Sequence, residues 1–194
     1  MQVKMLDELA SITFGYTFRK AIEENPNGGM RVIQARDISA KAVFQDTDSL
    51  TRVDVGPVAL SAFMRRGDVL MATRGATVGG YKVAIYDAES GLSVFASSSL
   101  FILRSITEVL PEYLVVYLNS DHAQRDLQDK STGATVRSIP RGELGKIRIP
   151  VPSMDVQKNI VALQENIKQQ NKLLNQRLTI NNQIIDTIIK QISN

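Results

Sequence analysis

A four-residue segment with the chemistry of phosphate contact occurs twice in the chain. Gly-Ala-Thr-Val stands at residues 75–78 and again at residues 133–136, each time among basic residues. Each copy offers backbone N–H groups, a hydroxyl and neighbouring cations, which together suit contacts to phosphate oxygens. Four-residue coincidences are common, so we infer no duplication, and a pair of tight turns without a ligand is the competing interpretation. The predicted DNA-binding residues are Arg74, Thr77, Lys82, Lys130, Thr132, Arg137 and Arg141.

Basic charge is concentrated around the second copy. Between Lys130 and Arg148 there are five basic residues and one acid, Glu143. The formal net charge of the whole chain is only +3. That excess points weakly toward nucleic acid, and slight basicity without a functional meaning explains it equally well.

The residues that most enzymes need are missing. The single histidine, His122, is expected on a helix, and there is no cysteine. A lone helical histidine is more often a surface residue than a base or a metal ligand. The chain contains no Gly-x-Ser-x-Gly elbow and no Gly-Lys-Ser/Thr phosphate loop. We therefore expect a non-catalytic protein without metal or cofactor.

The candidate residues must be positioned by a body that spans residues 1–152. Short apolar runs predict strands at 30–35, 69–72, 81–86, 94–103 and 146–149. Residues 5–14 predict a short helix or bend that leads into a strand. Pro111 should open a helix that runs, directly or through a continuation, to about Gln128. This order of elements predicts a mixed α/β (α+β) domain in which glycine-bearing loops carry the basic residues.

The tail, residues 153–194, predicts one long helix. Pro150 and Pro152 favour an extended approach, Ser153 can cap the helix, and no proline or glycine follows. Apolar residues recur at coiled-coil spacing, and at about 1.5 Å per residue the helix would extend roughly 60 Å. Such a helix is too long to lie on its own body, so we expect it to form a spacer and a dimerisation surface. The seam residues are Ile160, Ile167, Leu174, Leu178, Ile185, Ile188 and Ile192.

Membrane and secretory segments are not predicted. No apolar run approaches the roughly 18 residues of a membrane span, and the first residues lack the apolar region of a signal peptide. The absence of cysteine is compatible with a reducing compartment. We expect a cytoplasmic protein.

Several segments together resemble the specificity subunits of type I restriction–modification systems over nearly the full length. The similar segments are Leu6-Asp7-Glu8-Leu9-Ala10 with Gly15, Arg36-Asp37-Ile38, Gly67-Asp68-Val69-Leu70 with its glycine loop, Pro111-Glu112-Tyr113-Leu114, the loop 133–139, and Ile149-Pro150-Val151-Pro152 followed by Gln157-Lys158 and Ile160-Val161. Ser153 and Val156 depart from the family pattern, which usually has proline and glutamate there. Neither change threatens the fold, because Ser153 and Asp155 can cap and charge the helix start.

The resemblance implies a target-recognition domain followed by a conserved spacer helix. Full-length members carry two of each, so this chain resembles a half-size subunit that reads one half of a bipartite DNA site. Two copies would pair through their helices, antiparallel as the family's two spacer helices are. The implied partners are double-stranded DNA and methyltransferase subunits, with the restriction subunit as a further candidate. A freestanding DNA-binding regulator and a coiled-coil adaptor are the alternatives, although no helix-turn-helix is recognisable and an adaptor leaves the basic loops unexplained.

Overall fold

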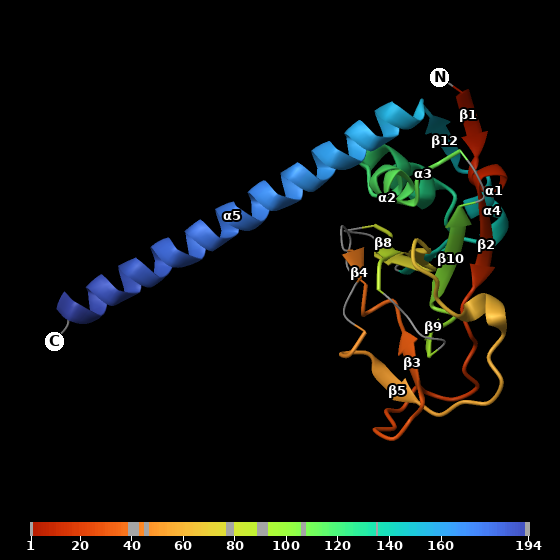
Figure 1. Cartoon of the computed structure of the whole chain (residues 1–194), viewed down its shortest axis with the longest axis horizontal. Coiled ribbons are helices and arrows are strands. Elements are labelled where there is room, and N and C mark those ends of the chain that lie inside the picture. The colour runs from red at the N-terminus through yellow and green to blue at the C-terminus, as the bar shows by residue number, and fades with distance from the viewer. Residues whose placement is uncertain are drawn as a thin grey trace.

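The computed structural model describes residues 2–38, 43–44, 47–76, 80–88, 93–105, 108–134 and 136–192. It consists of a mixed α/β body and one long C-terminal helix that projects away from it (Figure 1). The predicted fold class is confirmed. Among the described residues, no helix is long and apolar enough to cross a membrane.

A five-stranded sheet forms the centre of the body. Its order is β2 (Ala10–Phe14), β10 (Leu100–Ser105), β6 (Val69–Ala72), β8 (Val83–Tyr86) and β4 (Val43–Phe44), and only the β8–β4 pair is parallel. Every residue of β6 and β8 is buried. Alternate side chains point to opposite faces of a strand, so Val69 and Met71 enter one core while Leu70 and Ala72 enter another. The sheet is therefore covered on both faces.

A three-stranded sheet extends the body at the lower end of Figure 1. It joins β5 (Thr51–Val53), β3 (Met30–Ile33) and β9 (Val94–Ala96), and a short 3-10 helix, η1 (Leu60–Ala62), follows β5 in the chain. The single strand predicted at 94–103 is wrong in one respect, because β9 and β10 belong to different sheets. The chain changes sheet at Ser97, whose backbone N–H donates to the carbonyl of Ile33 at 2.8 Å.

The helix predicted after Pro111 is followed by a separate second helix, the continuation that the sequence left open. The two helices are α2 (Pro111–Leu118), which packs on β8 and β6, and α3 (Asp121–Asp129). The break lies at Asn119 and Ser120. The Ser120 hydroxyl accepts from the N–H of Ala123 and so caps α3, while the Asn119 amide donates to the carbonyl of Val83 at 3.0 Å. These contacts stabilise the kink and tie α2 to the sheet.

The two ends of the body lie side by side. Strand β1 (Gln2–Met5) pairs antiparallel with β12 (Arg148–Val151), and the short helices α1 (Leu6–Leu9) and α4 (Arg141–Gly145) adjoin them. From β12 the chain enters α5 (Met154–Ile192), a helix of 39 residues. At about 1.5 Å per residue it is roughly 60 Å long, as the sequence predicts.

One buried amide anchors α5 to the body. Gln157 is 1% exposed; its side chain accepts from the N–H of Leu110 at 2.9 Å and donates to the carbonyls of Glu108 and Pro152. Ile160 and Val161 then pack against the core that lies under α2. The first turns of α5 are thus part of the body's packing, and the division at residue 152 stays a prediction.

Candidate nucleic-acid interface

The two copies of Gly-Ala-Thr-Val are brought together by a pair of strands. Strand β7 (Arg74–Ala76) pairs antiparallel with β11 (Val136–Ser138), so that Ala76 lies opposite Val136 and Gly75 opposite Arg137. We call these six residues the β7–β11 ribbon. The predicted site residue Thr77 lies outside the described residues.

The inner face of the ribbon is occupied by an aromatic ring. Tyr81 is buried, and a Cβ built on Gly75 would come within 3.0 Å of its ring. Glycine at position 75 therefore lets strand β7 approach the ring closely. Since partners in an antiparallel pair share a face, Arg137 also lies on this inner face.

Arg137 has a structural contact rather than a free charge. Its guanidinium donates to the carbonyl of Gln128, in the last turn of α3, at 2.8 Å. A cation is favoured at the negative end of a helix. Burial raises the pKa of Tyr81. The hydrogen bond to Ser131 and the charge of Arg137 each offset part of that rise. Arg137 and Arg74 thus lie on opposite faces of the ribbon, and a DNA contact by either residue stays a prediction.

Tyr81 is held at both its backbone and its hydroxyl. The Gln124 amide accepts from the Tyr81 N–H at 2.7 Å and donates to its carbonyl at 3.0 Å. The Tyr81 hydroxyl lies 2.6 Å from that of Ser131, which in turn donates to the carbonyl of Leu127. Because the Ser131 hydrogen is used there, Tyr81 is the donor to Ser131. These contacts hold Tyr81 against α3.

The outer face of the ribbon is exposed. Arg74 is exposed, and Val136 has 56% of its surface accessible. Thr132 is also exposed, and its backbone exchanges hydrogen bonds with Ser138 at 2.9 and 2.8 Å. This narrow turn needs Gly133, whose φ of +108° is disfavoured for other residues. The cation of Arg74, the apolar side chain of Val136 and the hydroxyl of Thr132 are thus exposed on or beside the outer face of the ribbon.

The other predicted site residues are more dispersed. Lys82 is exposed and donates to the carbonyl of Ala35 at 3.4 Å. Lys130 is half-buried at the end of α3, and its charge contributes to lowering the pKa of Glu143, after the larger effect of Lys146. Arg141 lines a different cleft, beside Asp7, Ser11 and Thr13. The ribbon and Thr132 are therefore the best grouped part of the predicted surface.

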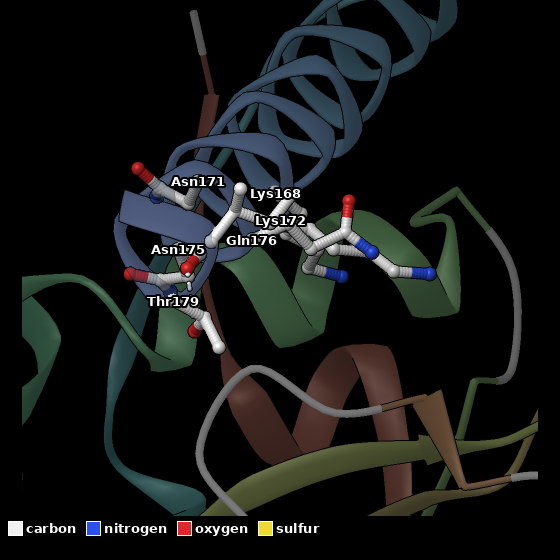
Figure 2. A pocket seen from close by; sticks show the side chains of 7 residues that line it. Lys168, Asn171, Lys172, Asn175, Gln176 and Thr179 are labelled. Atoms are coloured by element: carbon white, nitrogen blue, oxygen red, sulfur yellow. Dashed lines mark hydrogen bonds between the residues drawn. The ribbon is translucent and has the colours of Figure 1, made fainter. Parts of the chain in front are cut away.

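The predicted seam of α5 is largely uncovered. Ile160 is half-buried against the chain's own core. The exposed seam residues range from 41% to 79% accessible: Ile167, Leu174, Leu178, Ile185, Ile188 and Ile192. Figure 2 shows an open face in the middle of the helix whose labelled residues, from Lys168 to Thr179, all come from α5. None of these labelled residues belongs to the predicted seam.

Comparison with known families decides what kind of protein carries this geometry. The model of the type I restriction modification DNA specificity domain matches residues 1–184. The chain belongs to the type I restriction–modification DNA specificity family. A search among curated proteins found no match.

Solved structures share the fold of this specificity-family chain. The HsdS subunit from Thermoanaerobacter tengcongensis is 20% identical with a TM-score of 0.61, and the match covers 91% of this chain and 39% of that one. The S subunit of the type I system from M. genitalium is 16% identical, with a TM-score of 0.58 and coverage of 94% and 42%. A third structure, described as the basis of complex assembly and conformational transition of the type I R-M system, is 21% identical with a TM-score of 0.64. That match covers 89% of this chain and 39% of that one. The chain thus spans about two fifths of the length of these proteins.

The predictions from the sequence missed the residues that hold Tyr81 in place beside the ribbon. Gln124 and Ser131 hold Tyr81 against α3, although none of the three was singled out for that role. Tyr81 stood at the start of a predicted strand, and only its place directly after Gly79-Gly80 hinted at a loop anchor. Gln124 could have been suspected as a polar residue beside the buried Ala123 and Leu127 of α3.

Proposed function

We propose that this chain is the DNA-recognition subunit of a type I restriction–modification assembly and reads one half of a bipartite site. The observation that carries the proposal is the β7–β11 ribbon, which unites both glycine-bearing basic segments and leaves Arg74 and Val136 exposed on the outer face. A two-stranded ribbon fits the major groove, where arginine reads guanine and apolar groups contact the thymine methyl. Family membership supports the same interpretation.

The catalytic steps belong to partner subunits in this proposal. Methyltransferase subunits would carry the cofactor and the methyl transfer, and a restriction subunit would carry cleavage where one is present. The chain supplies sequence recognition and docking. Methyl transfer from S-adenosylmethionine to DNA by the purified chain alone would contradict this division of labour.

Two copies would combine into one two-domain reader through α5. Its last turns expose Ile180, Ile184 and Ile188 by about half their surface. A lone helix with that surface is prone to aggregate, and burial of one isoleucine contributes roughly 1.5–3 kcal/mol. The antiparallel orientation follows the family resemblance. A dimer with two-fold symmetry presents the same reader twice and would select an inverted repeat.

The test of recognition uses the chain assembled with methyltransferase subunits. Duplexes selected by this complex from a random library should carry an inverted repeat with a fixed gap. Changing both Arg74 and Lys82 to alanine should weaken binding and reduce the slope of log affinity against log salt by up to about 1.8, since each phosphate contact contributes about 0.9. The matched control is Arg148→Ala, an exposed arginine on β12.

The outcomes separate the competing functions. Unchanged affinity in the Arg74 and Lys82 variant would remove the ribbon from the DNA interface. Specific DNA binding by the chain without any methyltransferase subunit, together with failure to co-purify one, would favour a freestanding regulator. Dimerisation without DNA binding in any assembly would favour a coiled-coil adaptor.

A further inference from the structure

Two series of residues at seven-residue spacing share one side of α5. The first series is Gln164, Asn171, Leu178, Ile185 and Ile192, and the second is Ile160, Ile167, Leu174, Asn181 and Ile188. Steps of three and four residues connect the series, so they form one stripe along the helix. The amides are Gln164 and Asn171 in the first series and Asn181 in the second; all other members are apolar. The positions of those amides restrict how a second copy can pair with this stripe.

We propose that α5 pairs with α5 of a second copy in one antiparallel register, with Asn171 opposite the partner's Asn181 and Leu174 opposite the partner's Leu178. The proposal rests on the dimer of the proposed function and adds its alignment. The midpoint of the pair falls at Gln176, halfway between Asn171 and Asn181.

This register matches apolar residues with apolar residues along nearly the whole helix. In antiparallel pairs a residue of one series faces a residue of the other. Ile167 then faces the partner's Ile185, and Ile160 faces the partner's Ile192. Both asparagines face each other and can exchange amide hydrogen bonds. The one mixed layer places Gln164 opposite the partner's Ile188, and Gln164 is half-exposed, so its amide retains access to water.

Registers displaced by one heptad match less well. In one of them Asn171 faces the partner's Leu174, and Ile188 faces the partner's Gln157, whose amide is already buried in hydrogen bonds with the body. In the other, Asn171 faces the partner's Ile188 and Asn181 faces Leu178. A buried amide without a partner costs about 1–3 kcal/mol, and two-fold symmetry repeats each mismatch. The amides therefore act as register markers.

A parallel pair is disfavoured by the body rather than by the helix. In that arrangement each layer pairs identical residues, so the amides would also match. However, both bodies would lie at the same end of the helix pair. There Ile160 is half-covered by its own core and Gln157 is fully engaged. In the antiparallel pair the free end of each helix lies beside the other body instead.

Cysteine cross-linking can test this register because the natural chain contains no cysteine. In the double variant Asn171→Cys/Asn181→Cys, each introduced cysteine lies opposite the partner's other cysteine, and mild oxidation should convert most of the chain into a covalent dimer. Within one helix the two positions are about 15 Å apart, too far for a disulfide. Single Asn171→Cys should remain uncross-linked, since the two copies of residue 171 are then also about 15 Å apart.

Two comparisons make every outcome informative. Efficient cross-linking of single Asn171→Cys would show a parallel pair, and efficient cross-linking of Gln164→Cys/Asn181→Cys would show a register displaced by one heptad; either result overturns the proposal. Light scattering on the unmodified chain is measured in parallel. A dimer that cross-links only in these comparison variants, or in none, retains the proposed dimer and rejects the register, whereas a monomer rejects the dimer itself.

Discussion

The hydroxyl of Tyr113 donates a hydrogen bond of 2.8 Å to the backbone carbonyl of Pro150. One turn further along α2, the Tyr117 hydroxyl donates to the carbonyl of Arg148 at 2.9 Å. Four residues of helix rise about 6 Å and two residues of strand about 6.7 Å, so the hydroxyl spacing matches alternate carbonyls of β12. The two tyrosines cover the edge of β12 that faces away from β1, next to the point where α5 leaves the body.

We predict that Tyr113→Phe lowers the free energy of unfolding by about 1–3 kcal/mol, because the Pro150 carbonyl loses its donor in a partly buried position. Urea denaturation provides the measurement. The control is Tyr16→Phe, because the Tyr16 hydroxyl has no hydrogen-bond partner within the described part of the chain and its ring contacts with Phe18 and Phe95 are retained. Equal losses in the two variants would contradict the assigned contact.

Alkaline pH should destabilise the body. Burial raises the pKa of Tyr81, Tyr113 and Tyr117 above the ordinary value of 10.0. The folded state therefore holds these protons more tightly, so this contribution to stability is complete below pH 10 and is lost as pH rises through the folded pKa values. The urea midpoint should change little between pH 7 and 9 and fall above about 10. Tyr113→Phe/Tyr117→Phe should show a smaller fall, and an identical fall would contradict the prediction.

Replacing Gln157 by methionine should destabilise the junction between the body and α5. Methionine preserves the length of the side chain but leaves the Leu110 N–H and the Glu108 carbonyl without their partner. We expect the free energy of unfolding to fall by about 1–3 kcal/mol. Gln191→Met, at an exposed position near the end of α5, serves as the matched control and should have little effect on the body. Equal stability of the Gln157 and Gln191 variants would refute the role of the amide as an anchor.

Gly75→Ala should displace Tyr81 or separate the two strands of the ribbon. The added Cβ would lie 3.0 Å from the Tyr81 ring, whereas at Gly142 nothing lies within 4 Å of an added Cβ. Overpacking of this kind costs about 1–3 kcal/mol. We expect the assembled complex of Gly75→Ala to lose DNA affinity several-fold while Gly142→Ala retains it. Full affinity in both variants would show that the ribbon tolerates the displacement.

Local patterns predicted the elements whose signals are local. The buried run Val69–Ala72 is a strand, and the two prolines before Ser153 place the start of α5 correctly. The pairing of β7 with β11 depends on contacts between residues far apart in the sequence, which no periodicity reports. The same limit applies to Arg137, whose hydrogen bond to the carbonyl of Gln128 at the end of α3 no local pattern predicted, while its DNA contact stays a prediction. The sequence left open whether one helix or a helix with a continuation follows Pro111, so it did not predict the position of the break at Asn119.

The pairing of β1 with β12 places Gln2 opposite Val151, three residues before α5 begins. In the proposed antiparallel dimer, Ile192 of one copy lies opposite the partner's Ile160, only about 9 Å along the helix from its start. The last turn of each copy is thus a neighbour of the other copy's first strand. A short peptide could therefore join the C-terminus of one copy to the N-terminus of the other without moving either body. A second such link would close the chain into a circle, which could be cut at a different loop to give a circular permutant. Such tandem and permuted chains would keep the same reader, so its symmetry does not depend on how many polypeptides encode it.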